Sequence, residues 1–319
     1  MRVALFGGTG FVGSYLVDRL LQAGMQPVLL VRPGHESRVR HRRVCDIVAG
    51  ELDDSEAVER VLRGADAAIY NVGILREYPE RGITFEKLHF EAARRTMQAA
   101  ERAGVGRFLL MSANGVKAQG TPYQTSKYRA EQFLATTTMD WTVFRPSVIF
   151  GNPRGRNEFA TQLARDIVAS PLPAPLFYGG LFPSGAGEFA MSPAHVRDVA
   201  EAFVKALTTP ETIGQVLHLG GPRSVSWRQI LTDIANAVGR RKLMVPVPAL
   251  GVSAVAALLD RFESFPVTRD QLQMLLEDNT CGDGAFALLG IEPTRFSPEQ
   301  LGYLMDTNKD KEKCLKNAA

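Results

Sequence analysis

The stretch that decides the fold is Val3-Ala4-Leu5-Phe6-Gly7-Gly8-Thr9-Gly10-Phe11-Val12-Gly13. Its apolar residues predict a buried strand, its glycines recur at intervals of three, and a helical pattern follows. Gly7 can adopt the backbone angles of a tight turn, Gly10 leaves room for a bound group, and Gly13 lets the helix pack closely on the strand. Backbone amides at the start of the helix would then face an anion. This context predicts a pyrophosphate-binding turn over residues 7–13 and disfavours the alternative, a sharp turn that binds nothing.

Composition excludes several classes of protein. With 319 residues, 45% of them hydrophobic and 22% charged, the chain has the balance of one large globular domain or of a domain with a smaller annex. A net charge of +3, without a basic stripe interleaved with aromatics, argues against nucleic-acid binding. The cysteines, Cys45, Cys281 and Cys314, are widely spaced and odd in number, which excludes a disulfide framework or a zinc site. We expect a cytoplasmic protein without a signal peptide and without a metal.

Strand and helix patterns alternate through the first half of the chain. The predicted strands cover residues 3–6, 27–31, 46–49, 67–71, 108–111 and 142–144. The predicted helices cover residues 11–23, 55–62, 85–103 and 123–136. This alternation predicts an α/β protein with a Rossmann-type doubly wound parallel sheet.

The pattern changes after residue 150. Residues 152–157 and 171–183 are rich in Gly, Arg or Pro and are expected to form loops. Helices are expected over 159–169, 199–207, 227–238, 253–261 and 269–276, with one short strand over 216–219. We therefore expect a Rossmann domain over residues 1–150, a smaller mixed region for substrate or partner over 151–306, interleaved with the first, and a flexible tail over 307–319.

The end of the second predicted strand indicates which dinucleotide binds. A carboxylate there would hydrogen-bond the ribose 2′-OH of NAD, but this chain has Arg32, with Arg38 close behind. A guanidinium suits a 2′-phosphate, so we expect NADP(H). If Arg32 is only a surface residue, NAD(H) remains possible.

Two further strand ends carry candidate cofactor contacts. Glu51-Leu52-Asp53 follows the third strand, where a carboxylate could accept from the adenine amino group. Asp53 and its neighbour Asp54 could also cap the helix that begins near residue 55. Asn71-Val72-Gly73 ends the fourth strand, where a ligand passes in an open α/β sheet, and Gly73 would allow close approach of the nicotinamide ribose.

A Tyr-Lys pair is the second informative motif. Tyr123 and Lys127 are four residues apart, so they share one face of the predicted helix. The ammonium is expected to lower the pKa of the phenol and make Tyr123 a general acid or base, while Lys127 could also hold the ribose hydroxyls. A chance pair on a solvated helix is the alternative.

These motifs together resemble the extended and atypical short-chain dehydrogenases/reductases. The matching stretches are residues 7–13, Tyr123-x-x-x-Lys127, residues 145–151 (RPSVIFG) and residues 195–200 (HVRDVA). Residues 276–279 and 289–294 are similar to the nucleotide-binding accessory subunit of respiratory complex I. The resemblance implies that Tyr123 is the catalytic acid/base with Lys127 as its partner, that Asp198 anchors a strand-to-helix junction, and that Pro146, Ser147, Val148 and Ile149 border the nicotinamide.

One position departs from this family. Active members carry a hydroxyl that orients the substrate carbonyl shortly after the fifth strand. Here Ser112 stands at the first place of that motif, and Ala113 and Asn114 follow. Asn114 could donate to a carbonyl oxygen through its amide, so Ser112 and Asn114 are both candidates.

Three functions follow, in order of preference. The first is an NADP(H)-dependent oxidoreductase that acts on a small hydrophobic carbonyl or quinone-like substrate held between the sheet edge and the annex. Leu75, Leu176, Phe177 and Phe182 suggest this apolar substrate, unless they are ordinary core residues. The second is a non-catalytic NADPH-binding accessory or assembly protein of a respiratory, complex I-like membrane complex. The third is a sugar-nucleotide epimerase or dehydratase.

A basic cluster is the candidate contact surface for the second function. Residues 240–242 (RRK) precede an apolar stretch over 247–259 that is predicted to be helical. This pattern could make a peripheral contact with a membrane or a membrane complex, but a core helix behind a solvated turn is the favoured interpretation.

Overall fold

The computed structural model describes residues 1–180, 182–248, 273–274, 276–282 and 284–305. The chain divides into two compact units. Unit 1 comprises residues 1–146, 196–219 and 283–292, and unit 2 comprises residues 147–195, 220–282 and 293–319. Each unit is described by itself.

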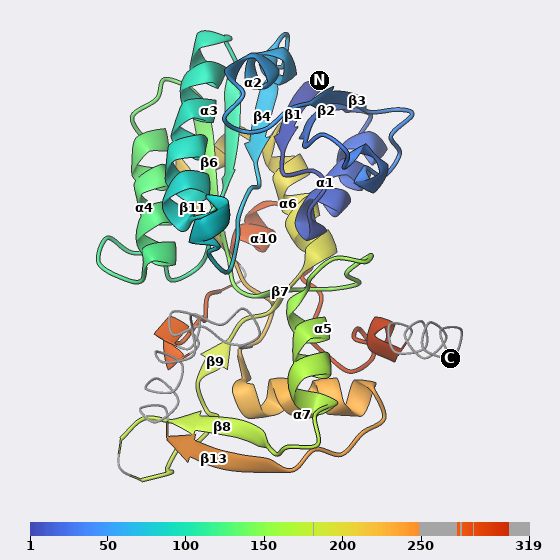
Figure 1. Cartoon of the computed structure of the whole chain (residues 1–319), viewed down its shortest axis with the longest axis vertical. Coiled ribbons are helices and arrows are strands. Elements are labelled where there is room, and N and C mark those ends of the chain that lie inside the picture. The colour runs from blue at the N-terminus through green and yellow to red at the C-terminus, as the bar shows by residue number, and fades with distance from the viewer. Residues whose placement is uncertain (181, 249–272, 275, 283, 306–319) are drawn as a thin grey trace. The chain divides into compact units, whose positions relative to one another are not determined.

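Unit 1 is built on a sheet of seven parallel strands in the order β11-β6-β5-β4-β1-β2-β3 (Figure 1). The strands are β1 (Arg2–Phe6), β2 (Gln26–Val31), β3 (Asp46–Ala49), β4 (Ala67–Tyr70), β5 (Arg107–Met111), β6 (Asp140–Pro146) and β11 (Gln215–Leu219). The helices are α1 (Phe11–Gln22), α2 (Ser55–Leu62), α3 (Ala92–Arg102), α4 (Pro122–Leu134), α6 (Val196–Ala206) and α10 (Gly284–Leu288). The predicted doubly wound parallel sheet is confirmed.

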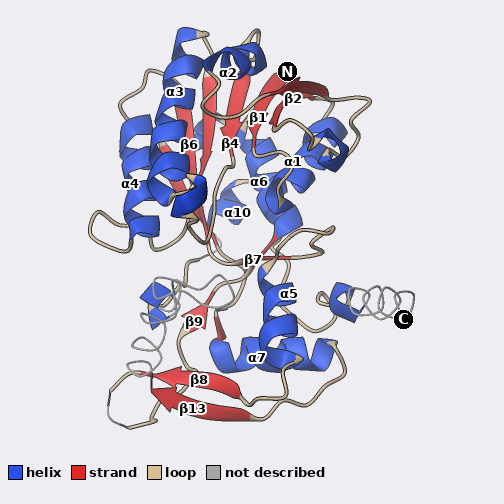
Figure 2. Ribbon diagram, in the orientation of Figure 1, coloured by secondary structure: helices blue, strands red, loops and turns tan. Residues whose placement is uncertain are grey.

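Both faces of this sheet are covered, which explains why its central strands are uniformly apolar. Phe6, Tyr70 and Phe108 join the core cluster under α2, α3 and α4, the helices in front of the sheet in Figure 2. On the other face, Phe144 of β6 packs against Phe203 of α6 with ring centroids 4.3 Å apart. Alternate residues of each strand therefore serve opposite faces.

Unit 2 is smaller, and the strands among its described residues form short pairs. Its strands are β7 (Ile149–Phe150), β8 (Ala174–Tyr178), β9 (Ala190–Met191), β10 (Ala194–His195), β12 (Val225–Ser226) and β13 (Met244–Pro248). Its helices are α5 (Phe159–Leu163), which continues as a π-helical turn η4 (Ala164–Val168), and α7 (Trp227–Ala237). Trp227, Ile230 and Leu231 of α7 lie in the core of this unit, together with Phe150.

The structure corrects several predicted elements. The loop expected over residues 171–183 contains β8, which pairs in parallel with β13, and residues 247–248 belong to β13 rather than to a helix. Proline obscured both strands. It cannot donate to a ladder, but a two-stranded sheet leaves one edge of each strand unpaired, where proline is tolerated. The first turns of the helix predicted over 85–103 are π-helical (η3, Glu86–Glu91), and α6 begins earlier than predicted, at Val196.

Some predictions fall on residues outside the described ranges. These are the helix over 253–261, most of the helix over 269–276, the remainder of the apolar stretch 247–259 and the tail over 307–319.

The turn between β1 and α1 is held by two close backbone contacts. Gly7 has a φ of +92°, and a Cβ on it would lie 2.6 Å from the carbonyl oxygen of Asn71, just after β4. A Cβ on Gly13 would lie 2.1 Å from the carbonyl oxygen of Gly7. The predicted roles of these glycines in the tight turn and in close helix–strand packing agree with this geometry.

We expect Gly13→Ala to destabilise unit 1 strongly, because the new methyl group meets backbone that cannot rotate away. The free energy of unfolding should fall by about 2 kcal/mol or more, the range for overpacking. Gly106→Ala is the matched control, since its site has open space around the added Cβ. Urea denaturation of both variants measures the difference, and equal midpoints would contradict the close approach.

Candidate functional site

The glycine turn lies where the strand order reverses. β1 has β4 on one side and β2 on the other, and ligands of open α/β sheets bind at this switch point, outside the carboxyl ends of the strands. Gly10 is the N-cap residue of α1 and is exposed, and its amide donates to the Gly7 carbonyl at 3.1 Å. Gly10 has no capping side chain, and the first turn of α1 has no acidic residue.

This turn fits a dinucleotide pyrophosphate. The α1 N-terminus offers amides and the positive end of a helix of 12 residues, with no carboxylate in its first turn to repel an anion. Thr9, Phe11 and Val12 are partly exposed around it, whereas Gly13 is buried beneath it. The amino-terminal end of α1 is therefore accessible to a ligand.

The two predicted 2′-phosphate ligands are exposed. Arg32 directly follows β2, and Arg38 ends a short 3₁₀ helix, η1 (Glu36–Arg38). Glu36, the acidic residue of this loop, accepts a hydrogen bond from the Gly34 amide at 3.2 Å. The end of β2 therefore offers arginines where an NAD-selective site would have a carboxylate, and this suits a 2′-phosphate.

The structure shows which residue of the segment after β3 caps the helix that follows it. Asp54, not Asp53, caps α2 by accepting from the Ala57 amide at 3.0 Å. Asp53 is exposed and forms an ion pair with Lys87 at 3.6 Å. Glu51 is exposed as well, while Leu52 packs against the core under α2.

The segment after β4 meets the Tyr-Lys helix. The Asn71 amide donates to the Phe6 carbonyl at 2.9 Å, and Val72 packs on the core. A Cβ on the exposed Gly73 would lie 3.6 Å from Lys127 Nζ and 3.7 Å from His89 Nε2. The structure thus brings Gly73 and Lys127 together, as a shared contact with one ligand requires.

Lys127 is held at a defined place on α4. This helix begins with a capping box, in which Thr121 and Gln124 each accept from the other's backbone amide. Lys127 Nζ donates to the Met111 carbonyl at 3.1 Å, at the end of β5, and lies 5.7 Å from the centre of the Tyr123 ring. Burial lowers the pKa of Lys127 to about 8, against the opposing effect of Glu131, so the side chain is still mainly protonated at neutral pH.

The expected lowering of the Tyr123 pKa is wrong for this structure. Burial raises the pKa of Tyr123 above its ordinary value. The rings of Phe85 and His89 pack against the phenol ring in T-shaped arrangements, with centroids 5.6 and 5.2 Å from its own. This desolvation outweighs the ammonium of Lys127. Tyr123 is therefore a neutral phenol and can donate a proton.

The structure also argues against Ser112 as the residue that orients a substrate. Ser112 is buried, and its Oγ donates to a carboxylate oxygen of Glu131. The same carboxylate accepts from Arg145 Nε at 3.0 Å and from Arg145 Nη2. The Ser112 hydroxyl therefore donates its hydrogen bond to a carboxylate that is already paired with Arg145. These contacts hold the end of β5, α4 and β6 together.

Asn114 is oriented differently. Its backbone N–H donates to the Pro146 carbonyl at 2.8 Å, and its side-chain Oδ1 lies 2.8 Å from His218 Nδ1. Burial and the charge of Arg145 lower the pKa of His218, so its imidazole is neutral and donates from Nδ1. This bond fixes the side chain of Asn114 with the oxygen toward His218, so that the amide nitrogen is the donor on its other side.

His89 is a site residue that the sequence interpretation missed. Its Nε2 accepts from the Ile74 amide at 3.0 Å, and its Nδ1 lies 3.2 Å from Ser126 Oγ, which donates to the Tyr123 carbonyl at 3.0 Å. Burial, reinforced by the charge of Lys127, lowers the pKa of His89 to about 2. His89 therefore stays neutral and links the loop after β4 to the turn of α4 that carries Tyr123. No spacing in the sequence relates it to Tyr123, whereas Glu131 lies one further helical turn beyond Lys127 and could have been found.

The remaining predicted contacts fall in both units. Pro146 ends β6 in unit 1, but Ser147, Val148 and Ile149 belong to unit 2. Ser147 is buried and donates to the Asn279 carbonyl at 2.8 Å, and Val148 packs on the core of unit 2.

The apolar candidates for substrate contact differ in burial. Leu176 and Phe177 are buried in the core of unit 2, which supports the alternative of ordinary packing for both. Leu75 and Phe182 are exposed.

Comparison with known proteins agrees with this geometry. A family model described as NAD(P)H-binding matches residues 7–168. The chain is 26% identical over 310 residues to the mitochondrial NADH-ubiquinone oxidoreductase 40 kDa subunit of Neurospora crassa, covering 94% of this chain and 78% of that protein. It is 28% identical over 269 residues to a ceramide reductase of Caulobacter vibrioides, covering 83% and 80%.

Among solved structures, the UDP-glucose 4-epimerase of Thermus thermophilus in complex with NAD aligns with a TM-score of 0.72 at 20% identity, covering 96% of this chain and 98% of that one. These findings confirm the predicted resemblance to extended short-chain dehydrogenases/reductases and to a complex I subunit.

The neutral state of His89 makes folding sensitive to acid. The unfolded chain binds a proton at His89 as the pH falls below its ordinary pKa of 6.5, whereas the folded chain does so only near 2. This contribution to stability is complete above pH 6.5 and is lost at up to about 1.4 kcal/mol per unit as the pH falls. Between pH 7.5 and 5.0, wild type should lose about 2 kcal/mol more than His89→Gln in urea denaturation. Parallel pH profiles would contradict a buried neutral His89.

Proposed function

Because this chain belongs to the family of NAD(P)H-binding proteins, we propose that it is an NADP(H)-dependent oxidoreductase that acts on the carbonyl group of a small hydrophobic molecule. The observation that carries the proposal is the juxtaposition of Gly73, Lys127 and Tyr123 in the unit that holds the glycine turn. A turn that binds pyrophosphate and a Tyr-Lys pair on a helix whose lysine contacts the end of β5 are the parts that hydride transfer to a carbonyl requires.

Each part of the site has one task in this proposal. The amides of residues 7–13 hold the pyrophosphate, and Arg32 and Arg38 hold the 2′-phosphate. Asn71-Val72-Gly73 and Lys127 hold the ribose next to the nicotinamide. When bound, the nicotinamide supplies the hydride for reduction or accepts it for oxidation.

Tyr123 moves the proton. In reduction, its neutral phenol donates the hydroxyl proton to the carbonyl oxygen as the carbonyl carbon gains a hydride, and the alcohol is released. The Lys127 ammonium beside the ring stabilises the phenolate left behind. Asn114, oriented by His218, donates its amide hydrogen to the substrate oxygen, the task that Ser112 cannot perform while its proton goes to Glu131.

The substrate class is supported by a relative. A protein 28% identical to this chain is named a ceramide reductase, which favours a lipid-like carbonyl compound over a sugar nucleotide. A quinone-like substrate remains compatible with the same site chemistry. The epimerase likeness, at 20% identity, is a likeness of fold alone.

A second function is favoured by a specific observation. Ser112 is engaged in the network with Glu131 and Arg145, and several relatives are named subunits of NADH-ubiquinone oxidoreductase or NADH dehydrogenase. A non-catalytic NADPH-binding accessory or assembly protein, attached peripherally to a membrane complex, would keep the turn and the arginines but would not need turnover. None of the helices in the described ranges has the length and apolarity to span a bilayer.

The cofactor preference is tested by Arg32→Glu. Hydrogen bonds to charged groups contribute about 1.5–3 kcal/mol, so NADPH affinity should fall by roughly 10- to 100-fold while NADH affinity changes little. Fluorescence titration with both nucleotides measures this. Arg43→Glu, at another exposed arginine of the same basic stretch, is the control. If the NADPH preference survives Arg32→Glu but is lost in Arg43→Glu, the assignment of Arg32 to the 2′-phosphate is wrong.

Tyr123→Phe tests the chemistry. Loss of the general acid should lower kcat by about 10²- to 10⁴-fold with NADPH affinity retained. The readout is NADPH oxidation with a panel of ceramide-like ketones and quinones, followed by absorbance. Equal rates in both proteins would remove Tyr123 as the acid. Tight NADPH binding with no turnover of any panel member by wild type would favour the accessory function.

A further inference from the structure

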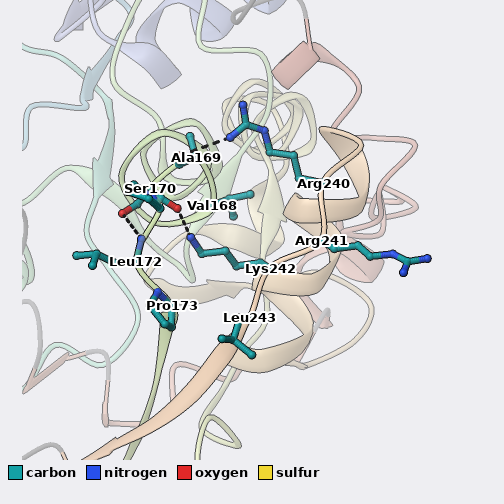
Figure 3. Close-up of a pocket in the computed structure, with 10 residues that line it drawn as sticks. Val168, Ala169, Ser170, Leu172, Pro173, Arg240, Arg241, Lys242 and Leu243 are labelled. Carbon is teal, nitrogen blue, oxygen red and sulfur yellow. Dashed lines mark hydrogen bonds between the residues drawn. The ribbon is translucent and has the colours of Figure 1, made fainter.

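A pocket in unit 2 is lined by none of the residues assigned to catalysis. It has a volume of about 440 Å³ and is lined by residues 168–173 and 240–243 (Figure 3). The two segments precede the paired strands β8 and β13, and the Ala174 amide donates to the Leu243 carbonyl at 2.8 Å. The pocket is therefore held at the amino-terminal end of a strand pair.

The wall formed by residues 240–243 is cationic. Arg240 Nη1 donates to the Ala169 carbonyl at 3.5 Å, and Lys242 Nζ donates to the Ser170 carbonyl. Arg241 is exposed and extends away from both bonds in Figure 3. None of the described residues that line the pocket is acidic, and the polar contacts of Arg240 and Lys242 named above are with backbone carbonyls. Burial and the charge of Arg240 lower the pKa of Lys242, as expected for crowded cations that lack an anion.

Exposed leucines flank these cations. Leu172 is 71% exposed and Leu243 is 69% exposed, and both line the same pocket. An exposed leucine on its own needs no explanation, but leucines beside clustered arginine and lysine combine the two forces that hold proteins on membrane surfaces, apolar burial and attraction to anionic lipids. An acidic peptide or a nucleic acid would use the cations but would leave the leucines in water.

We propose that Leu172, Leu243 and the cations Arg240, Arg241 and Lys242 form a docking patch for the surface of an anionic phospholipid bilayer. The leucines enter the headgroup region, and lipid phosphates take the place of the missing anion beside the pocket. The patch binds lipid whether or not the chain turns over a substrate, and it would bring a site for hydrophobic molecules to the phase in which they dissolve.

The test is vesicle flotation of the full chain. Wild type should float with vesicles that contain phosphatidylcholine and roughly one third phosphatidylglycerol, and not with phosphatidylcholine alone. Binding should fall as salt screens the cations. No flotation with the anionic vesicles at low salt would overturn the proposal.

Two variants separate the contributions of charge and apolar contact. Arg241→Glu should weaken vesicle binding by about ten-fold or more, because it removes a cation that has no carbonyl partner in Figure 3 and adds an anion. Leu172→Ser combined with Leu243→Ser should weaken it by a similar factor without a change in charge. The matched control is Arg42→Glu, since Arg42 and Arg43 are exposed cations followed by Val44, which is 60% exposed.

The outcomes distinguish a bilayer from other anions. Loss in both patch variants but not in Arg42→Glu, with NADPH titration unchanged in all three, supports the patch. Equal loss in Arg42→Glu would indicate non-specific attraction and overturn it. Leucine variants that bind normally, with wild type displaced by soluble glycerophosphate, would assign the pocket to a free anion instead of a membrane.

Discussion

The closeness of three backbone segments is the constraint on which the site depends. The Gly7 carbonyl lies where a Cβ of Gly13 would be, and the Asn71 carbonyl lies where a Cβ of Gly7 would be. Any side chain at these two positions would push α1 from β1 or β1 from the end of β4. The missing methyl groups therefore do more than permit a turn. They fix the amino-terminal end of α1 against the switch point of the sheet, so that the anion-binding amides and the loop that ends at Gly73 share one edge.

Next to this edge, the α4 helix carries three polar side chains at intervals of four residues. Tyr123, Lys127 and Glu131 follow one another on one face, and each has a different electrostatic task. Glu131 pairs with Arg145 and accepts a hydrogen bond from Ser112. These contacts fix the C-terminal end of the face to β6 and to the end of β5. Lys127 keeps its charge through Glu131 and the Met111 carbonyl despite burial. Tyr123, at the other end of the face, packs against the rings of Phe85 and His89, and burial keeps it neutral. The side chains on this face of α4 therefore change from an ion-paired carboxylate at Glu131 to a neutral phenol at Tyr123.

The sequence was sufficient for the sheet and for most of its helices, since alternating apolar runs and glycine positions are local signals. The strands β8 and β13 were missed because proline masks a strand that sits at an edge. The site was only half predictable. The spacing of Tyr123 and Lys127 identified the pair, but the sign of the Tyr123 pKa shift depends on Phe85 and His89, which reach the phenol only through tertiary packing. For the same reason Ser112 could be placed by motif, yet its commitment to Glu131 could not be read from its position.

In the proposed function, the protonation states favour carbonyl reduction over alcohol oxidation. A buried phenol whose pKa lies above its ordinary value gives up a proton only when negative charge develops on its partner, as on a carbonyl oxygen that receives a hydride. The reverse reaction needs a phenolate before the alcohol binds, and burial opposes that state in this structure. His89, held neutral by burial and by the charge of Lys127, adds no positive charge that would favour the phenolate. In the proposed function, the rings that desolvate the phenol therefore suit Tyr123 to carbonyl reduction, and the charge of Lys127 beside the ring lowers the cost of losing its proton.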